Sequence, residues 1–170
     1  MAMTRTYVIT GSASGIGQAT AQKLKSLGNT VIGVDIHNAD VVADLGTPQG
    51  RIDAAKKTIE LSNNSIDAVI ACAGLAHPTA TTVSVNYFGV TEFLNELLPT
   101  LTKSTTPRVA ITSSVASIMP NSPELVDAMC ANDEAKAVEI AQSLVDAGGG
   151  GEALIYGSTK RAISRWIRQQ

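Results

Sequence analysis

The glycine-rich segment TGSASGIG at residues 10–17 constrains the fold of this chain more than any other feature. It follows a short β-branched run at residues 7–10 and precedes a helical stretch from about Ile16 to Leu27, which Gly28-Asn29 caps. Glycines at such a junction let the backbone approach a pyrophosphate closely, and the positive end of the following helix favours that anion. A plain glycine-rich turn is the alternative. The placement between strand and helix favours dinucleotide binding by Gly11, Ser14, Gly15, Ile16 and Gly17.

The rest of the chain alternates between strand and helix patterns. Further strands are predicted at residues 31–36, 40–44, 66–72 and 108–112, and helices from Pro48 onward and at 85–98. In the helix that begins at Pro48 we expect Ile52, Ala55 and Ile59 to face inward. Pro99 is expected to end the helix before it. This order predicts an α/β fold, a Rossmann-like doubly wound parallel sheet.

The pattern changes to helices after Ser114. Ser122-Pro123-Glu124 predicts one helix start and Asn132 or Asp133 another, with Gly148–Gly151 ending the second helix after Ala147. Residues 120–150 therefore form a predicted helical insertion before the helix that carries Tyr156. The length of 170 residues predicts a single domain, residues 1–170.

Composition excludes several classes of protein. The formal net charge of −2 and the lack of Lys/Arg runs argue against nucleic acid and anionic membrane surfaces as partners. No apolar stretch approaches the roughly 18 residues of a membrane span, and no signal-peptide core is present, so a cytoplasmic location is expected. Cys72 and Cys130 match no zinc spacing and suggest no disulfide framework. No metal is predicted.

Acidic and small residues at strand ends predict the nucleotide and its binding residues. Asp35 ends the second strand, 24 residues after Gly11, where a carboxylate can accept both ribose hydroxyls of NAD and would repel a 2′-phosphate. A solvated loop acid is the alternative, but NAD is favoured because no arginine neighbours Asp35. Asp44 and Leu45 follow the third strand, where they could border the adenine, or Asp44 could instead cap a turn. Small residues at Ala73 and Gly74 would leave room for the cofactor.

Tyr156 and Lys160 are four residues apart and therefore share one face of a helix. A phenol there can exchange a proton while the neighbouring ammonium stabilises the phenolate. An ordinary amphipathic helix surface is the alternative, although Ile163 and Ile167 continue the same face. Ser114 ends the fifth strand, where a hydroxyl can bond a substrate carbonyl as charge develops. By itself the Ser113-Ser114 pair is typical of a strand-to-loop transition.

Taken together these residues resemble the short-chain dehydrogenase/reductase family. The motifs that match are Thr10-Gly-x-x-x-Gly-x-Gly17, Asp44, Ala71-Cys-Ala-Gly74, Asn86, Ser114 and Tyr156-x-x-x-Lys160. The resemblance implies acid/base catalysis by Tyr156, carbonyl orientation by Ser114 and cofactor binding by Lys160. It gives Asn86 a structural and proton-relay role that supports Lys160 through an ordered water. Ser113 is the alternative to Ser114.

Several segments resemble bacterial 3α-hydroxysteroid dehydrogenase/carbonyl reductase within this family, among them residues 34–36, 42–45, 72–75, 84–89 and 113–117. This implies reversible, NAD-linked interconversion of a secondary alcohol and a ketone, with steroids or other carbonyl compounds as candidate substrates, in a homo-oligomer. Family members continue through further strands and a substrate loop, so the chain is expected to be incomplete at its C-terminus. A non-catalytic dinucleotide-binding module is the alternative. A Rossmann-like methyltransferase would explain the glycine loop but not the Tyr-Lys pair.

Overall fold

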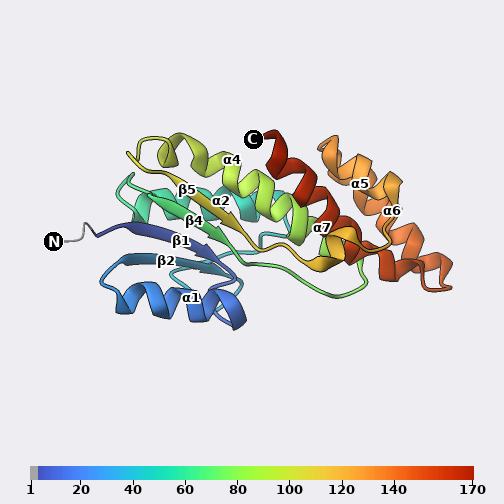
Figure 1. The fold of residues 1–170 in the computed structure, drawn as a ribbon, viewed down its shortest axis with the longest axis horizontal. Helices are drawn as coiled ribbons and strands as arrows, with labels where there is room; N and C mark the ends of the chain where they lie inside the picture. The colour runs from blue at the N-terminus through green and yellow to red at the C-terminus, as the bar shows by residue number, and fades with distance from the viewer. Residues whose placement is uncertain (1–3) are drawn as a thin grey trace. The chain divides into compact units, whose positions relative to one another are not determined.

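A five-stranded parallel sheet is the core of the first of two compact units of this chain (Figure 1). The computed structural model describes residues 4–170. Unit 1 contains the described residues up to Ala73 together with Glu92–Thr112, and unit 2 contains Gly74–Thr91 and Ser113–Gln170. The organisation of residues 1–170 as a single domain stays a prediction.

The sheet of unit 1 has the strand order β3-β2-β1-β4-β5. The strands are β1 (Thr6–Thr10), β2 (Thr30–Asp35), β3 (Val41–Val42), β4 (Ala68–Ala71) and β5 (Arg108–Ile111). All pairs are parallel, and Val8 of β1 lies opposite Ile32 on one side and Val69 on the other. Val8 and Val69 are fully buried, as expected of strands that are covered on both faces. The predicted doubly wound fold is confirmed.

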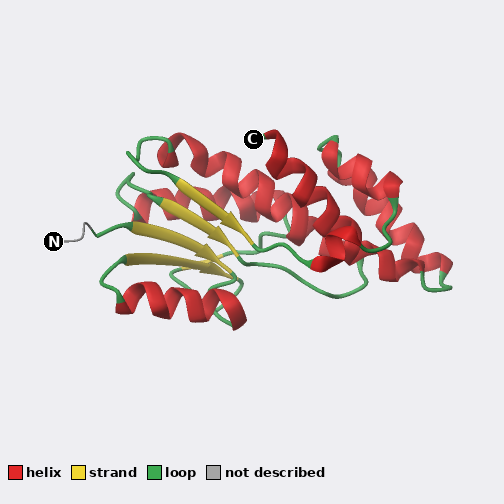
Figure 2. Ribbon diagram, in the orientation of Figure 1, coloured by secondary structure: helices red, strands yellow, loops and turns green. Residues whose placement is uncertain are grey.

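Helices cover both faces of this sheet (Figure 2). Helix α1 (Gly15–Ser26) lies on one face, and α2 (Pro48–Leu61) lies on the other with the part of α4 (Gly89–Leu101) that belongs to unit 1. The predicted start of α2 is confirmed, because the hydroxyl of Thr47 accepts a hydrogen bond from the Gly50 amide at 3.1 Å. The N-terminal cap and Pro48 therefore fix where α2 begins.

The predicted inward face of α2 is wrong at one position. Ile52 is 48% exposed, whereas Arg51 is fully buried and its Nε lies 2.8 Å from Glu92 Oε2 on α4. Ala54, Ala55 and Thr58 complete the buried face. At this position an arginine that is paired with α4, not an isoleucine, faces inward, which a hydrophobic pattern cannot reveal.

Helix α4 also departs from the sequence prediction, because it runs through Pro99 to Leu101. Proline removes one backbone donor, but here that loss falls within the last turn of the helix. The Thr102 amide and hydroxyl both donate to the Leu98 carbonyl, each at 3.0 Å. These bonds stabilise the helix end that Pro99 weakens.

Unit 2 is built from helices. They are α3 (Ala80–Val83), the π-helix η1 (Ser84–Phe88), the 3₁₀-helix η2 (Val115–Ile118), α5 (Pro123–Cys130), α6 (Glu134–Ala147), η3 (Gly151–Ala153), α7 (Leu154–Trp166) and η4 (Ile167–Gln169). Ser122 and Asp133 cap α5 and α6, accepting hydrogen bonds from Leu125 and Lys136 at 3.3 and 3.0 Å. Both predicted helices of the 120–150 segment are therefore present.

Large apolar side chains from several helices fill the core of unit 2. Phe88 of η1, Leu125 and Met129 of α5 and Ile155 of α7 are all fully buried. Helix α7 packs against α5, η1 and η2, and α6 packs against α3 and α5. Over residues 4–170, no helix is long and apolar enough to cross a membrane.

Candidate functional site

The glycine-rich loop of unit 1 connects β1 to α1 at the point where the strand order reverses. Strands β2 and β4 lie on the two sides of β1, so the switch point, where ligands bind in such sheets, lies at the end of β1 beside Thr10. The Ala73 amide after β4 donates to Thr10 Oγ1 at 3.1 Å, and a Cβ on Gly11 would lie 2.8 Å from that same amide nitrogen. The two strand ends approach so closely that only glycine fits at position 11.

The N-terminus of α1 has free groups for an anion. Ser14 is the N-cap residue, yet its side chain makes no capping hydrogen bond, and Ser14, Gly15 and Ile16 are all exposed. No acidic residue lies in the first turn, so nothing there competes for the positive end of the helix. This arrangement fits a pyrophosphate, which helix N-termini of this kind bind.

Gly15 and Gly17 are glycines for different physical reasons. Gly15 has φ = +52° with open space around it, so its backbone conformation alone favours glycine. At Gly17 a Cβ would collide with the carbonyl oxygen of Gly11. The loop therefore folds back so that Gly17 lies against the backbone of Gly11.

Asp35 lies at the end of β2, as predicted, and is half-buried. Its Oδ2 accepts a hydrogen bond from the Ala13 amide of the glycine-rich loop at 2.9 Å, and its Oδ1 accepts one from the Ile36 amide at 2.7 Å. The carboxylate thus joins the loop to β2. Each carboxylate oxygen has a second acceptor position, so ribose hydroxyls could also be bound.

Asp44 and Leu45 differ in their surroundings. Asp44 is exposed and its Oδ1 accepts from the Gly46 amide at 2.8 Å, so the turn-capping alternative describes its contact in the structure. Leu45 is 5% exposed, which leaves mainly its backbone for a ligand. Their role beside an adenine stays a prediction, as does that of Ala73 and Gly74.

Asn86 is held by three hydrogen bonds. It lies in the π-helix η1, is 2% exposed, and binds both main-chain groups of Leu75. Its Oδ1 accepts from the Leu75 amide at 2.7 Å, while its Nδ2 donates to the Leu75 carbonyl at 2.8 Å and to Thr159 Oγ1 at 3.2 Å. Asn86 therefore connects the loop after residue 74 to α7.

Helix α7 carries Tyr156 and Lys160 on one face, as their spacing predicts. The Lys160 ammonium nitrogen lies 5.7 Å from the centroid of the Tyr156 ring, and Lys160 is 8% exposed whereas Tyr156 is half-buried. A cation over an aromatic ring at this distance is attracted by the ring. The pair thus brings a positive charge to a phenol that solvent can still reach.

The two serines that follow β5 make different contacts. Ser114 is half-buried and is the N-cap of η2, where its Oγ accepts from the Ala116 amide at 3.2 Å. Ser113 is exposed, and its Oγ lies 3.4 Å from Ser164 Oγ. The hydroxyl hydrogen of Ser114 is not used by the capping bond and remains able to donate. Both assignments of the substrate-orienting serine therefore stay predictions.

Thr159 was not among the predicted site residues. It is fully buried, donates to the Tyr156 carbonyl at 2.8 Å and accepts from Asn86. Its bond to Asn86 spans 73 positions of the chain, so no local pattern could have revealed it. Thr159 fixes the turn of α7 that carries both Tyr156 and Lys160.

Cys130 is unsuited to nucleophilic chemistry. Burial raises the pKa of its thiol, and burial likewise raises the pKa of Tyr87, whose hydroxyl is hydrogen-bonded to Cys130. A thiol nucleophile needs the opposite shift. Cys130 is therefore a packing residue of unit 2.

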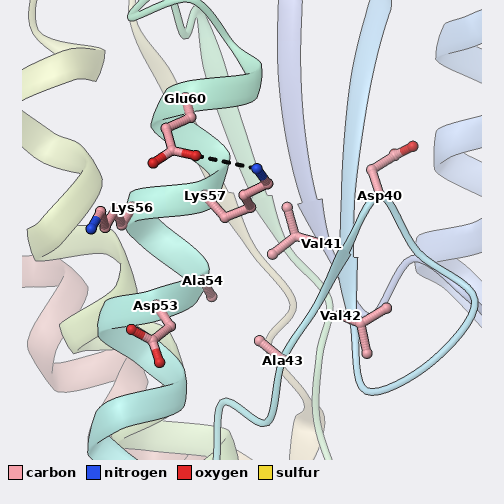
Figure 3. Close-up of a pocket in the computed structure, with 9 residues that line it drawn as sticks. All are labelled: Asp40, Val41, Val42, Ala43, Asp53, Ala54, Lys56, Lys57 and Glu60. Carbon is pink, nitrogen blue, oxygen red and sulfur yellow. Dashed lines mark hydrogen bonds and ion pairs between the residues drawn. The ribbon is translucent and has the colours of Figure 1, made fainter.

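A cavity in unit 1 does not involve the predicted residues. It has a volume of about 500 Å³ and lies between β3 and α2, where Lys57 and Glu60 form an ion pair at 3.2 Å (Figure 3). Its walls come from residues 40–43 and from Asp53, Ala54, Lys56, Lys57 and Glu60. None of the candidate cofactor-binding residues lines it, so it carries no part of the site.

Comparison with known proteins identifies relatives of this chain. The model of the short chain dehydrogenase family matches residues 5–126, which contain the glycine-rich loop, Asn86 and Ser114 but end before Tyr156. The 3-alpha-hydroxysteroid dehydrogenase/carbonyl reductase of Comamonas testosteroni is 38% identical over 96% of this chain and 64% of its own length. Coniferyl-alcohol dehydrogenase of a Pseudomonas species is 39% identical over 52% of this chain and 36% of its own. The chain thus spans less than two thirds of these relatives.

A solved structure gives the same result at the level of the fold. The 3-alpha-hydroxysteroid dehydrogenase of Pseudomonas sp. B-0831, complexed with NADH, superposes with a TM-score of 0.87 and 38% identity. The match covers 96% of this chain and 70% of that one. The parallel sheet, its flanking helices and the glycine-rich loop define a Rossmann-like α/β protein. The chain belongs to the short-chain dehydrogenase family, whose members are oxidoreductases, and the predicted resemblance to the hydroxysteroid dehydrogenase/carbonyl reductase group is confirmed.

Proposed function

We propose that this protein is an NAD(H)-dependent oxidoreductase that interconverts a secondary alcohol and a ketone. The observation that carries the proposal is the Tyr156–Lys160 pair on α7, where an ammonium nitrogen lies 5.7 Å from the centre of a half-buried phenol ring. The named relatives are dehydrogenases and reductases of alcohols and carbonyl compounds, which supports the same reaction class. A 3-hydroxysteroid is the first substrate to test.

The residues of the β1–α1 loop fit a dinucleotide. Gly11 and Gly17 remove side chains where the backbone must come close, and the uncapped Ser14 leaves amide donors at the N-terminus of α1. The Asp35 carboxylate would accept from the ribose hydroxyls and would repel a 2′-phosphate, which favours NAD(H) over NADP(H). When bound, the nicotinamide supplies the acceptor for the hydride that leaves the alcohol carbon.

The protein's own residues handle the proton. In alcohol oxidation the Tyr156 phenolate oxygen takes the hydroxyl proton as the C–H bond gives up its hydride, so the substrate loses one proton and one hydride, which carries the two electrons. Ser114 donates a hydrogen bond to the substrate oxygen and orients it. Lys160 stabilises the phenolate and binds the nicotinamide ribose, while Asn86 and Thr159 hold α7 in place.

Two measurements test the proposal. NADH should bind with a change in its fluorescence, and a 3-hydroxysteroid or a simple secondary alcohol should be oxidised in the presence of NAD⁺. Tyr156→Phe removes the proton acceptor, so oxidation should fall at least about 100-fold while NADH binding persists. Oxidation by the Phe variant at the wild-type rate would refute the mechanism. NADH binding without any alcohol oxidation would indicate a non-catalytic dinucleotide-binding module instead.

A further inference from the structure

The turn after β3 is held against the first turn of α2 by its backbone carbonyl groups. The Asp44 carbonyl accepts hydrogen bonds from the Thr47 amide at 3.2 Å and from Thr47 Oγ1 at 3.1 Å. A Cβ on Gly50 would collide with the same carbonyl oxygen, so glycine lets α2 approach the turn this closely. The Leu45 carbonyl accepts a hydrogen bond from Arg51 Nη1 at 3.4 Å. Both carbonyls of the predicted adenine-binding pair therefore face α2.

This arrangement determines where the Leu45 amide points. In a planar trans peptide the N–H points opposite to the carbonyl. Since the Asp44 carbonyl faces α2, the Leu45 N–H points away from that helix. The Leu45 side chain is 5% exposed, so the turn offers a ligand mainly backbone groups at this residue. The Ala43 amide donates to the Asp35 carbonyl at 2.9 Å, which places the turn beside the proposed ribose-binding residue.

Arg51 connects this turn to helix α4. It is fully buried, and its Nε lies 2.8 Å from Oε2 of Glu92, whose side chain is 33% exposed. A buried ion pair often stabilises a fold no more than apolar residues of similar volume do, because both charges lose their hydration. An apolar pair could not donate a hydrogen bond to the Leu45 carbonyl. The forked guanidinium is thus suited to bind two partners at once, a carboxylate on α4 and a carbonyl of the turn.

We propose that Arg51 is a positioning residue for the adenosine half of NAD(H). Glu92 orients the guanidinium, the guanidinium fixes the Leu45 carbonyl, and the turn then presents the Leu45 amide to the adenine ring. This inference rests on the proposed function and gives a role to a side chain that is too buried to contact the nucleotide itself. If Arg51 only stabilised the fold, an apolar residue could replace it once Glu92 was replaced as well.

A double substitution separates positioning from stability. Arg51→Met leaves Glu92 without its partner and should lower the urea midpoint of unfolding, whereas Arg51→Met/Glu92→Leu removes both charges and should restore most of it. The affinity for NADH, measured by fluorescence titration, should be about tenfold weaker than that of the wild type in both variants, because neither has a donor for the Leu45 carbonyl. If the single variant does not fold, the double variant alone provides the test.

Reduced nicotinamide mononucleotide, which lacks the adenosine, distinguishes positioning from general damage to the site. Its affinity, measured by NMR titration, should change less than about twofold in the double variant. Lys57→Met/Glu60→Leu is the matched control, because it removes an exposed ion pair from the same helix and should leave both affinities unchanged.

Two outcomes would overturn the inference while the proposed cofactor binding would stand. One is wild-type NADH affinity in the double variant, and the other is an equal loss of affinity for NADH and for the mononucleotide. Failure of the wild-type chain to bind NADH would instead refute the proposed function, and with it the inference that depends on it.

Discussion

Asp35 shows how one side chain can serve both the fold and the proposed nucleotide. Its two carboxylate oxygens accept from the amides of Ala13 and Ile36, and these bonds hold the glycine-rich loop against the end of β2. The negative charge remains half-buried at the edge where ligands bind in such sheets. Cofactor preference and loop position are therefore linked through a single residue.

Replacing Asp35 by serine should change cofactor preference. The variant loses the acceptor for the ribose hydroxyls and the charge that repels a 2′-phosphate, so NADH affinity should fall about tenfold while NADPH affinity should fall less or rise. Fluorescence titration with both nucleotides measures this. Asp53→Ser is the control, because Asp53 is exposed and its carboxylate accepts from Gln49 at 2.9 Å. Tighter binding of NADPH than of NADH by the wild-type chain would contradict the prediction.

At the scale of elements, the β1–α1 loop depends on close backbone contact more than on chain flexibility. A Cβ at Gly17 meets the Gly11 carbonyl, whereas a Cβ at Gly15 meets open space and suffers only from the positive φ. A Cβ at position 17 would displace the loop, whereas a Cβ at position 15 would strain only that residue. Alanine at these two positions should therefore have unequal effects.

We expect Gly17→Ala to lower the free energy of unfolding by about 2 kcal/mol or more and to abolish NADH binding, because the loop must move. Gly15→Ala should cost about 1 kcal/mol, the price of a left-handed conformation for a residue with a Cβ, and should keep measurable NADH binding. Urea unfolding and fluorescence titration provide both readouts. Equal effects of the two substitutions would show that the contact with Gly11 is not what requires glycine.

Local signals made much of the fold predictable. The caps at Thr47, Ser122 and Asp133 each satisfy an amide three residues ahead, so sequence neighbours alone determine them. Long-range contacts could not be predicted in this way. Arg51, which pairs with Glu92, takes the inward position expected for Ile52, and α4 continues through Pro99 into a turn that Thr102 stabilises.

The candidate site was predictable in part for the same reason. The spacing of Tyr156 and Lys160 determines that they share a helix face, since helix geometry is local. The partners of Asn86, at Leu75 and Thr159, depend on how unit 2 folds and carry no sequence signal.

At the scale of the whole sheet, Asp67 joins segments that are distant in sequence. Its carboxylate accepts from the Thr6 amide at 2.9 Å and from Ser104 Oγ at 2.6 Å, and Arg5 lies nearby. The hydrogen bond from Ser104, followed by that from Thr6, lowers the pKa of Asp67 below its ordinary value. A carboxyl with a lowered pKa in the folded state stabilises the fold only while it is ionised.

The stabilisation by Asp67 should be complete above the unfolded-state pKa of about 3.9 and should be lost as the pH falls below it through the folded-state pKa. Asp67→Asn should be less stable by about 1–2 kcal/mol at pH 7, and its stability should fall less between pH 5 and pH 2.5 than that of the wild type. Urea unfolding across this range provides the measurement. Asp53→Asn is the control, and its free energy of unfolding should change with pH as that of the wild type does. The same pH dependence in all three proteins would refute the stabilising role of Asp67.

The edge of the sheet at β5 bears on self-association. Arg108, Val109 and Ala110 are exposed, and β5 pairs with β4 alone in the described sheet. Unpaired edge strands with apolar side chains favour pairing with another chain, and a lysine on the edge opposes it. Val109→Lys should therefore reduce concentration-dependent association in sedimentation velocity. Leu61→Lys, at a 44% exposed position on α2, is the control, and equal association of both variants and the wild type would exclude this edge as the interface.

Asn86 has a consequence for engineering the loop that follows residue 74. Its amide pairs with the backbone N–H and C=O of residue 75, as a neighbouring peptide would, and it makes no use of the leucine side chain for these bonds. The path of the chain after residue 74 is therefore held independently of what residue 75 carries. Library designs can therefore vary the side chain of residue 75 while position 86 is kept as asparagine. Aspartate at position 86 would lack the Nδ2 donor that binds the Leu75 carbonyl, so the loop after residue 74 would lose this bond.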